Sequence, residues 1–379
     1  MPIPSSHRPI APTEVGKILV IRPRFVGDVC LSTPVLTNLR RLAPQAALHY
    51  LTEEESAPLL ADDPRLTRLW ASSRKKGALD QARLAGELRA EKFDVVLDLF
   101  CNPRTALWTA VTGAPWRVGY PHKKFRSAAY NVPVRPTSKS AILFHLASLE
   151  ALGWEPRYEL PEIMLAPGEL TAARNHLAER GMPAGASMIG FHPGARWPTR
   201  RWGAEDFSAL GRRFLEERPR NWLLVFGGPG EGDLARAIAE GVGSPRALPI
   251  TDVALRRFAA LAKLCHAFVA GDTGPTHVAV SVGTPTVGIF GRSEPERTFP
   301  YPASAGHHSI YSGVWCSPCV LDVCDHMSCM RAISPDWVWD VLAKTLAFAD
   351  ARSAPGEDTA AAPAGPVPTH LLGAPRKPA

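Results

Sequence analysis

The chain has 379 residues, of which 45% are hydrophobic and 21% are charged, and this balance excludes a disordered or fibrous protein. Its length predicts two domains, each able to bury its own core. The net charge of +7, from 43 basic and 36 acidic residues, favours anionic partners such as phosphates, an acidic membrane surface or nucleic acid.

The terminal segments and the cysteines bear on the compartment in which we expect the protein. The N-terminal stretch MPIPSSHRPIAPTEVGK lacks the apolar region of a secretory signal, and no run approaches the roughly 18 apolar residues of a membrane-spanning helix. Seven cysteines, an odd number, fit a reducing compartment. We therefore expect a cytoplasmic protein, with residues 1–15 as a flexible lead-in and residues 351–379 as a disordered, Ala/Pro-rich tail.

Strand and helix patterns alternate along the first half of the chain. Short β-branched and aliphatic runs predict buried strands at KILVIR (17–22), ALHYLT (47–52) and FDVVLDLF (93–100). Helical periodicity follows each of them, at residues 34–42, 78–91 and 104–113. Thr33 is the expected N-cap of the first helix and Pro34 its first turn. This alternation is typical of a parallel, doubly wound α/β sheet.

The same pattern starts again after residues 154–186. Strands are expected at 187–194, 221–228, 266–272 and 284–291, and helices at 204–217, 231–242 and 337–349. The sequence therefore predicts two successive α/β domains, at residues 16–170 and 171–350. In sheets of this kind, ligands bind at the carboxyl ends of the strands.

The stretch GDTGPTH (271–277) allows two interpretations. Asp-Thr-Gly is the tripeptide of aspartic proteases, but these need two such carboxylates in an all-β fold, and an α/β pattern excludes that interpretation. The second interpretation is a strand that ends at Asp272, a tight turn at Gly274 and a helix that begins at Pro275. Asp272 or Thr273 is expected to cap this helix. A helix start beside a glycine is a ready site for an anion such as phosphate.

Four segments in this order resemble the bacterial lipopolysaccharide heptosyltransferases, glycosyltransferase family nine. They are RFVGDVCLSTP (24–34), HPGARWPTRRW (192–202), GDTGPTHVAVSVGTPTVGIFG (271–291) and CSPCVLDVCDHMSCM (316–330). The resemblance covers roughly residues 16–345. It implies a glycosyltransferase-B fold, with two facing Rossmann-like domains and a cleft between them. The first would bind the acceptor and the second the nucleotide-sugar donor.

The resemblance also implies an inverting transfer of heptose from ADP-heptose to the inner core of lipopolysaccharide. Asp28 matches the general base that deprotonates the acceptor hydroxyl, and we expect partial burial to raise its pKa towards the working range. The alternative for Asp28 is a simple helix cap. Basic residues that would face an anionic glycolipid acceptor, or form an ordinary solvated surface, are Arg22, Arg24 and the loop residues Lys123, Lys124 and Arg126.

Donor binding is assigned to three segments of the second half by the same resemblance. Its residues are Arg200, Arg201, Glu231, Asp272, Thr273, Gly274 and His277. The family usually carries a basic residue, often Lys, two places before the Trp of ARWPTRRW, which is Arg200 here. A guanidinium there would stabilise the diphosphate leaving group. Glu231 would hold the ribose, although a first-turn helix Glu explains it equally well.

We predict that the enzyme needs no metal or cofactor, because no Asp-x-Asp motif lies in a suitable loop.

A cysteine-rich segment has the spacing C-x2-C-x4-C-x4-C, formed by Cys316, Cys319, Cys324 and Cys329, and His326 lies between the last two. We expect them to pack as small, buried apolar groups; a zinc site and a redox-sensitive pair remain as alternatives.

Three other functions compete with heptose transfer. A related glycosyltransferase could use another nucleotide sugar, since the fold does not fix the substrate. A non-catalytic nucleotide-sugar binding protein would not need a base at Asp28. Nucleic-acid binding is disfavoured, because the basic residues are scattered and lack interleaved aromatics.

Peripheral contact with the inner membrane surface is expected of an enzyme that acts on a glycolipid.

Overall fold

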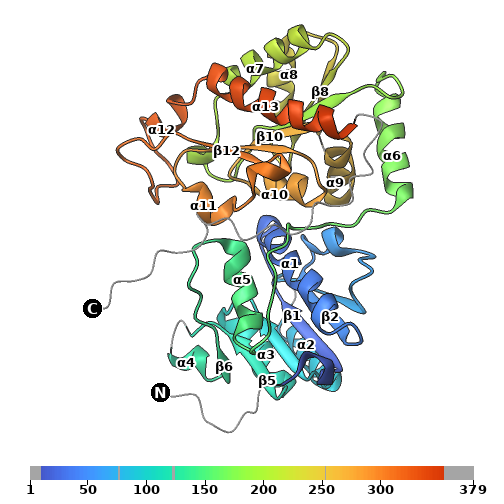
Figure 1. Cartoon of the computed structure of the whole chain (residues 1–379), viewed down its shortest axis with the longest axis vertical. Coiled ribbons are helices and arrows are strands. Elements are labelled where there is room, and N and C mark those ends of the chain that lie inside the picture. Colours follow the sequence, from blue (N-terminus) through green and yellow to red (C-terminus); the bar gives the residue numbers. More distant parts are fainter. Residues whose placement is uncertain (1–9, 76, 122–123, 252, 354–379) are drawn as a thin grey trace. The chain divides into compact units, whose positions relative to one another are not determined.

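The computed structural model describes residues 10–75, 77–121, 124–251 and 253–353. The described chain divides into two compact units, one up to Ile163 and one from Met164 onwards. Each unit contains one parallel β-sheet covered by helices (Figure 1), so the α/β prediction is confirmed. The expected domain boundary at residue 170 falls inside helix α6 (Pro167–Ala178) of the second unit.

The first unit has a six-stranded parallel sheet in the order β3-β2-β1-β4-β5-β6. Its strands are β1 (Lys17–Ile21), β2 (Ala47–Glu53), β3 (Arg68–Ser72), β4 (Val95–Asp98), β5 (Trp116–Gly119) and β6 (Val132–Pro133). Its helices are α1 (Val26–Leu42), α2 (Ala78–Ala90), α3 (Pro103–Thr112), α4 (Lys124–Ser127) and α5 (Ala141–Glu150), with short 3-10 turns at Pro12–Glu14 and Ala57–Leu60.

Helix α1 begins earlier than its sequence pattern predicts. Its N-cap is Phe25, and Pro34 lies inside the helix, so the expected start at Thr33 and Pro34 is wrong. A proline in a helix cannot donate to the carbonyl four residues earlier, which here belongs to Cys30. The hydroxyl of Thr33 donates to that carbonyl at 2.8 Å and replaces the missing hydrogen bond. Asp28 therefore lies in the first turn of α1.

The second unit has a six-stranded parallel sheet in the order β12-β11-β10-β7-β8-β9. Its strands are β7 (Met188–His192), β8 (Trp222–Gly227), β9 (Ala247–Thr251), β10 (Ala267–Gly271), β11 (Thr286–Phe290) and β12 (His308–Tyr311). Besides α6, its helices are α7 (Ala204–Glu217), α8 (Gly232–Val242), α9 (Leu255–Leu264), α10 (Gly274–Ser281), α11 (Pro295–Thr298), α12 (Ser328–Arg331) and α13 (Pro335–Ser353), with 3-10 turns at η3 (Pro198–Arg200) and η4 (Ala303–Ala305).

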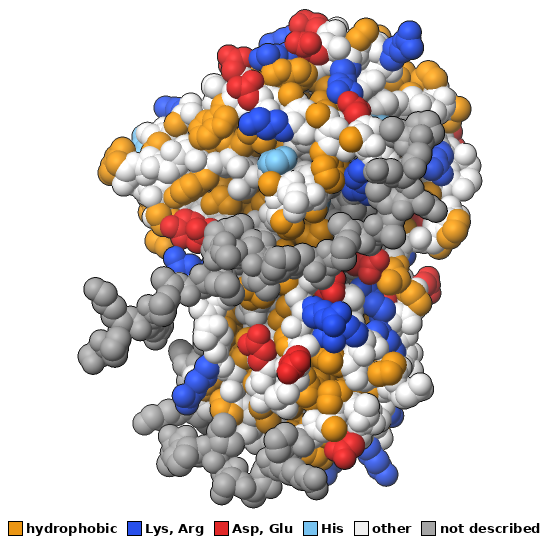
Figure 2. All heavy atoms as spheres, viewed as in Figure 1, with side chains coloured by type: hydrophobic (Ala, Val, Ile, Leu, Met, Phe, Trp, Pro, Cys, Tyr) orange, Lys and Arg blue, Asp and Glu red, His pale blue; other side chains and the backbone are white. Residues whose placement is uncertain are grey.

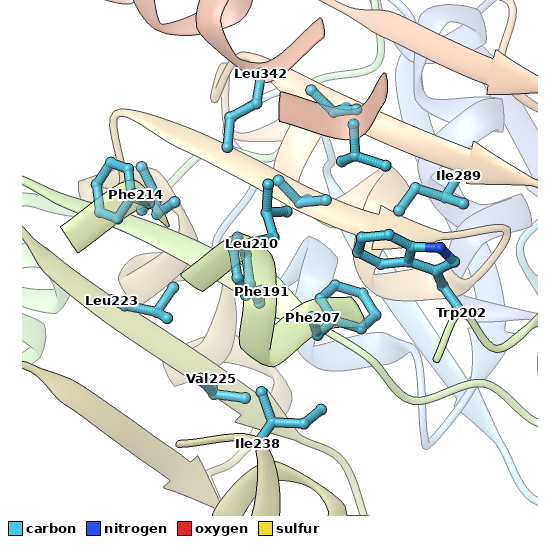
Figure 3. Close-up of a cluster of buried hydrophobic side chains, with 14 of the residues drawn as sticks. Phe191, Trp202, Phe207, Leu210, Phe214, Leu223, Val225, Ile238, Ile289 and Leu342 are labelled. Atoms are coloured by element: carbon cyan, nitrogen blue, oxygen red, sulfur yellow. The ribbon is translucent and has the colours of Figure 1, made fainter. Parts of the chain in front are cut away.

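Successive side chains of the second sheet point to opposite faces, and an apolar layer packs on each face. On one face, Phe191 of β7 packs with Phe207 and Phe214 of α7 and with Leu342 of α13 (Figure 3). On the other face, Phe268 of β10 meets the aromatic residues of α9 and β8. Helices α7, α8 and α13 lie on one side of this sheet and α9 and α10 on the other (Figure 1). Such two-sided burial holds the loops at the strand ends in place.

Both ends of the described chain depart from the expectation of unfolded tails. Residues 10–15 are not a loose lead-in, because Ile10 and Val15 are buried and the carbonyl of Ile10 accepts a hydrogen bond from the Trp154 indole at 2.8 Å. Helix α13 continues to Ser353, past the expected start of the tail. Residues 1–9 and 354–379 lie outside the described residues.

None of the helices that the structure describes combines the length and apolarity that a membrane crossing requires.

Candidate active site

The strand order of the first sheet reverses between β1 and β4, and ligands of such sheets bind beside this point. The chain leaves β1 at Arg22 and enters α1, whereas it leaves β4 through Leu99 and Phe100. Arg22 is buried between these two exits: it donates to the carbonyl of Leu99 at 2.7 Å and its guanidinium lies 5.1 Å from the Phe100 ring centroid.

The carboxylate of Asp28 is held at this place by two donors. One oxygen lies 2.6 Å from Nη2 of Arg22, and the other accepts from the backbone N–H of Phe25 at 3.0 Å. The Phe25 contact ties the carboxylate to the start of its own helix, as the cap interpretation requires. About a third of the side chain, 35%, remains exposed, so the same carboxylate is also open to a substrate.

The ionisation of Asp28 differs from our expectation. Burial alone would raise the pKa of Asp28, but the charge of Arg22 and the Phe25 hydrogen bond outweigh burial and lower this pKa below its usual value. The expected upward shift is therefore wrong. His145 of α5 lies within electrostatic reach of Asp28 and Arg22, and burial together with the Arg22 charge lowers the His145 pKa to about 3. Asp28 is therefore ionised and His145 neutral at physiological pH.

The other predicted acceptor residues are only partly brought to this place. Arg24 lies over the rings of Phe25 and Phe100, with its guanidinium 5.2 Å and 5.6 Å from their centroids. Arg126 donates to the carbonyl of Cys101 at 2.7 Å, directly after β4. Lys123 lies outside the described residues, and the structure describes Lys124 by its backbone alone, at the start of α4.

In the second sheet the strand order reverses between β10 and β7, and Asp272 follows β10. One Asp272 oxygen accepts from the Ser293 hydroxyl at 2.5 Å and lies 3.4 Å from Nη1 of Arg200. The same Arg200 nitrogen donates to the Asp272 carbonyl at 3.2 Å. A side chain at Gly271 would meet the Arg200 carbonyl oxygen at 2.6 Å. The glycine therefore allows the loop that follows β7 to approach the end of β10.

The start of helix α10 carries no side-chain cap from its N-cap residue. Thr273 makes no capping hydrogen bond, its hydroxyl lies 3.5 Å from that of Thr276, and Asp272 is engaged by Arg200 and Ser293. The expectation that Asp272 or Thr273 caps this helix is therefore wrong. The first-turn N–H groups, beginning at Gly274, and the positive end of the helix dipole are available to an anion.

Two further donor-site predictions lie near the strand ends of the same sheet. Glu231, at the start of α8, accepts from the Gly228 N–H at 3.1 Å and lies 3.6 Å from Nε2 of His192, the last residue of β7. His277 is buried in α10, and its Nδ1 lies 2.7 Å from the Tyr301 hydroxyl, which fixes the ring.

Arg201, the neighbour of Arg200, is directed elsewhere. Its Nε donates to the carbonyl of Ala195 at 2.8 Å and its side chain is exposed, whereas Arg200 contacts Asp272. The two neighbouring arginines thus make different contacts, and Arg200, which the family pattern marks, is the one beside Asp272.

Sequence reasoning missed two residues at these places. Ser293, the partner of Asp272, comes just after β11, so a systematic search of every strand end would have found it. His145 lies in the middle of α5, and no local signal connects it with Asp28.

The cysteine-rich segment differs from its expected packing. Cys329 is buried, whereas Cys316, Cys319 and Cys324 are partly exposed, and all four are free thiols. The expectation of four buried apolar groups is therefore wrong for three of them. Across the part of the chain that the structure describes, no cluster of three or more His, Cys, Asp or Glu residues is arranged to hold a metal ion.

Solved structures share this architecture. The structure of a family 9 glycosyl transferase from Veillonella parvula has a TM-score of 0.77 at 23% identity, over 89% of this chain and 99% of that one. The Escherichia coli ADP-heptose lps heptosyltransferase II has a TM-score of 0.72 at 21% identity, over 88% and 99%. This chain therefore has the glycosyltransferase-B type of fold, with two Rossmann-like units.

The sequence identifies the family. Residues 81–329 match the model of glycosyltransferase family 9 (heptosyltransferase), and this chain belongs to that family. It is 26% identical to lipopolysaccharide heptosyltransferase 2 of Escherichia coli, over 78% of this chain and 91% of that protein. It is 27% identical to lipopolysaccharide heptosyltransferase 1 of Pseudomonas aeruginosa, over 82% and 88%.

Proposed function

We propose that this enzyme is an inverting glycosyltransferase that moves heptose from ADP-heptose to an inner-core acceptor of lipopolysaccharide. The relatives named above are lipopolysaccharide heptosyltransferases, and a solved structure of the Escherichia coli heptosyltransferase WaaC holds ADP-2-deoxy-2-fluoro heptose. The observation that carries the proposal is the uncapped start of α10 beside Arg200, at the strand-order reversal of the second sheet.

The second unit would bind the donor. First-turn N–H groups of α10, around Thr273 and Gly274, receive the diphosphate. Arg200, whose side chain is 31% exposed, stabilises the negative charge that develops on ADP as it departs. Glu231 accepts hydrogen bonds from the ribose. His277, fixed by Tyr301, lies one turn further along the same helix and positions the sugar side of the diphosphate. Arg201 serves as a surface residue.

The first unit would bind the acceptor and carry the base. An acceptor hydroxyl attacks the anomeric carbon of heptose, the bond from that carbon to the diphosphate oxygen breaks, and the hydroxyl proton passes to Asp28. One displacement inverts the configuration. The lowered pKa keeps Asp28 ionised and ready, and the hydroxyl becomes acidic as the new bond forms, so a weak base suffices.

The acceptor is an anionic glycolipid in this proposal. Arg24 lies over the ring of Phe25, whose N–H donates to Asp28, and Arg126 donates to the Cys101 carbonyl after β4. Guanidinium groups are suited to phosphate or carboxylate groups. Arg22, which the sequence also placed at the acceptor, is a partner of Asp28. An acceptor of this kind is anchored in a membrane, so the enzyme would work in the cytoplasm with peripheral contact with the inner membrane surface.

A donor screen tests the proposal. The full chain is incubated with ADP-heptose, ADP-glucose, UDP-glucose or GDP-mannose, together with a water-soluble core fragment as the acceptor, and products are identified by mass. We expect ADP-heptose alone to give an acceptor one heptose heavier. Transfer from another donor would indicate a related glycosyltransferase. Binding of a donor without transfer would indicate a non-catalytic binding protein.

A further inference from the structure

A loop in the second unit has its backbone fixed while its apolar side chains face solvent. Residues 312–327 connect β12 to α12 without helix or strand, and we name them the 312–327 loop. Two neighbouring segments hold its backbone. The Cys319 N–H donates to the carbonyl of Arg292, after β11, at 2.9 Å, and the Thr199 hydroxyl in η3 donates to the carbonyl of Leu321 at 2.9 Å. The loop therefore has a defined shape.

The outward side chains of this loop are large and apolar. Trp315 is 87% exposed, Val320 87%, Val323 69% and Leu321 52%. Figure 2 shows hydrophobic side chains gathered over the part of the second unit where Figure 1 places α12. Scattered apolar residues are ordinary on a protein surface, but a contiguous group marks an interaction site. This loop holds half of the eight large hydrophobic side chains that are exposed among the described residues.

Charge does not oppose the burial of this loop. Its Asp322 carboxylate lies 2.7 Å from Nη1 of Arg292, which compensates that charge. Asp325 is exposed, and the exposed Arg331 follows in α12. The loop and its edges therefore carry little net charge. His326 lies parallel to the Trp315 indole, with ring centroids 6.0 Å apart and planes 18° from parallel, so the indole has a fixed support.

The area of the group limits what can cover it. A standard protein interface buries roughly 800 Å² on each partner, whereas one aromatic side chain contributes only about 150–250 Å². One tryptophan with three smaller aliphatic side chains falls short of that. A lipid interface needs no matching surface, and tryptophan prefers the headgroup level of a bilayer.

We propose that the 312–327 loop inserts Trp315, Val320, Leu321 and Val323 into the headgroup region of a phospholipid bilayer. Insertion would hold the enzyme at the surface that contains its acceptor. The choice of a bilayer as the partner rests on the proposed function, since a lipid-anchored acceptor requires it. Binding to the bilayer does not depend on catalysis, so the two proposals can fail separately.

Vesicle flotation tests the proposal with the full chain and vesicles of phosphatidylethanolamine and phosphatidylglycerol. The loop variant combines Trp315→Ser, Val320→Ser, Leu321→Ser and Val323→Ser, which leave the backbone bonds of the loop intact. The matched control combines Leu79→Ser and Leu107→Ser, two exposed residues of the first unit, at 85% and 60%. An unchanged melting temperature verifies that each variant is folded.

We expect the wild type and the control to float with the vesicles, and the loop variant to lose about tenfold or more of its partitioning. Because the insertion is apolar, binding is expected to persist in high salt. Three results would overturn the proposal: a wild type that stays unbound, a loop variant that binds like the wild type, and a wild-type dimer that the loop variant converts to monomer in sedimentation.

Activity measurements separate this proposal from the proposed function. With a water-soluble acceptor, the loop variant is expected to transfer heptose at the wild-type rate. With the acceptor embedded in vesicles, its rate is expected to fall about as much as its binding. A wild type that binds vesicles through the loop but transfers no heptose would refute the proposed function and leave the docking surface standing.

Discussion

The carboxylate of Asp28 is ion-paired with Arg22 and partly exposed to solvent. This arrangement allows us to predict the effect of a substitution on activity. Asp28→Asn keeps the shape and the polarity of the side chain but cannot accept a proton, so heptose transfer is expected to fall by about two to four orders of magnitude. ADP affinity is expected to remain unchanged, because Asp28 lies in the first unit and we assign donor binding to the second. Single-turnover assays and ADP calorimetry measure the two quantities.

Asp80→Asn is the matched control, because Asp80 also lies in the first turn of a helix, α2, and is exposed. Its activity is expected to equal that of the wild type. Near-normal turnover of Asp28→Asn would show that another group accepts the proton.

Arg22 is expected to set the pH range in which the base functions. The charge of Arg22 lowers the Asp28 pKa, so Arg22→Ala raises that pKa and Asp28 becomes protonated at a higher pH. The acidic limb of the kcat/KM profile is therefore expected to move to higher pH. Arg22→Lys retains the charge and is expected to leave the limb near its wild-type position. Equal loss of activity at every pH in Arg22→Ala would indicate a purely structural role.

Arg200 and Arg201 form a natural comparison within one short segment. Arg200 lies against Asp272 at the proposed diphosphate site, whereas Arg201 donates to the Ala195 carbonyl. Arg200→Ala is expected to weaken ADP binding by about 1.5–3 kcal/mol, because it removes a charge-assisted hydrogen bond. Arg201→Ala is expected to bind ADP like the wild type. Titration calorimetry decides, and the reverse pattern would show that Arg201 binds the diphosphate.

Single residues were predictable where a motif marks them and unpredictable where the partner comes from elsewhere in the chain. The sequence singled out Asp28, Arg200 and Asp272 as candidates. It could not show that Arg22 pairs with Asp28 or that Ser293 donates to Asp272. The direction of the Asp28 pKa shift depends on such pairings, so it could not be predicted from the sequence.

Among the elements, the predicted strands are those in the middle of each sheet. The seven expected strands correspond to β1, β2, β4, β7, β8, β10 and β11. All four edge strands, β3, β6, β9 and β12, were missed, together with the four-residue β5. Edge strands are partly exposed here, so they lack the continuous apolar run by which a central parallel strand is recognised. Helix α7 was predicted with its observed ends, because its apolar face repeats without interruption.

The 312–327 loop and helix α12 carry the four cysteines whose role the sequence left open. We expect purified protein to contain well under one zinc ion per chain, since zinc requires a tetrahedral set of ligands. Treatment with a chelator is expected to leave both transfer activity and the melting temperature unchanged. Elemental analysis and thermal unfolding measure these quantities. Stoichiometric zinc, lost together with folding on chelation, would instead establish a structural metal site.

At the scale of the whole molecule, the two units repeat one plan. In each sheet the strand order reverses beside the first strand of the unit, β1 or β7, and Asp28, Arg200 and Asp272 follow strands at that reversal. This plan was predictable, because the alternation of strand and helix patterns starts twice along the chain. The position of the boundary between the two units was not predictable. Helix α6 has no strand directly before it in the pattern, so the sequence does not show which unit it belongs to.

Each unit also contains a buried histidine that makes its stability depend on pH. Burial lowers the pKa of His145 in the first unit and of His307 in the second to about 3. The unfolded chain binds these protons near pH 6.5, so below that value the unfolded state binds more protons than the folded state and stability falls. From about pH 7 to about pH 5, each histidine is expected to reduce the free energy of unfolding of its unit by about 2 kcal/mol.

Urea unfolding at these two pH values measures the effect. His145→Gln and His307→Gln introduce side chains that do not titrate, so each variant is expected to lose its share of the pH dependence, whatever its stability at neutral pH. His326→Gln, at an exposed position, is the control and is expected to retain the wild-type dependence. If the double variant kept the full loss of stability between the two pH values, other groups would have to bind the protons on unfolding, and the two histidines would not be the source.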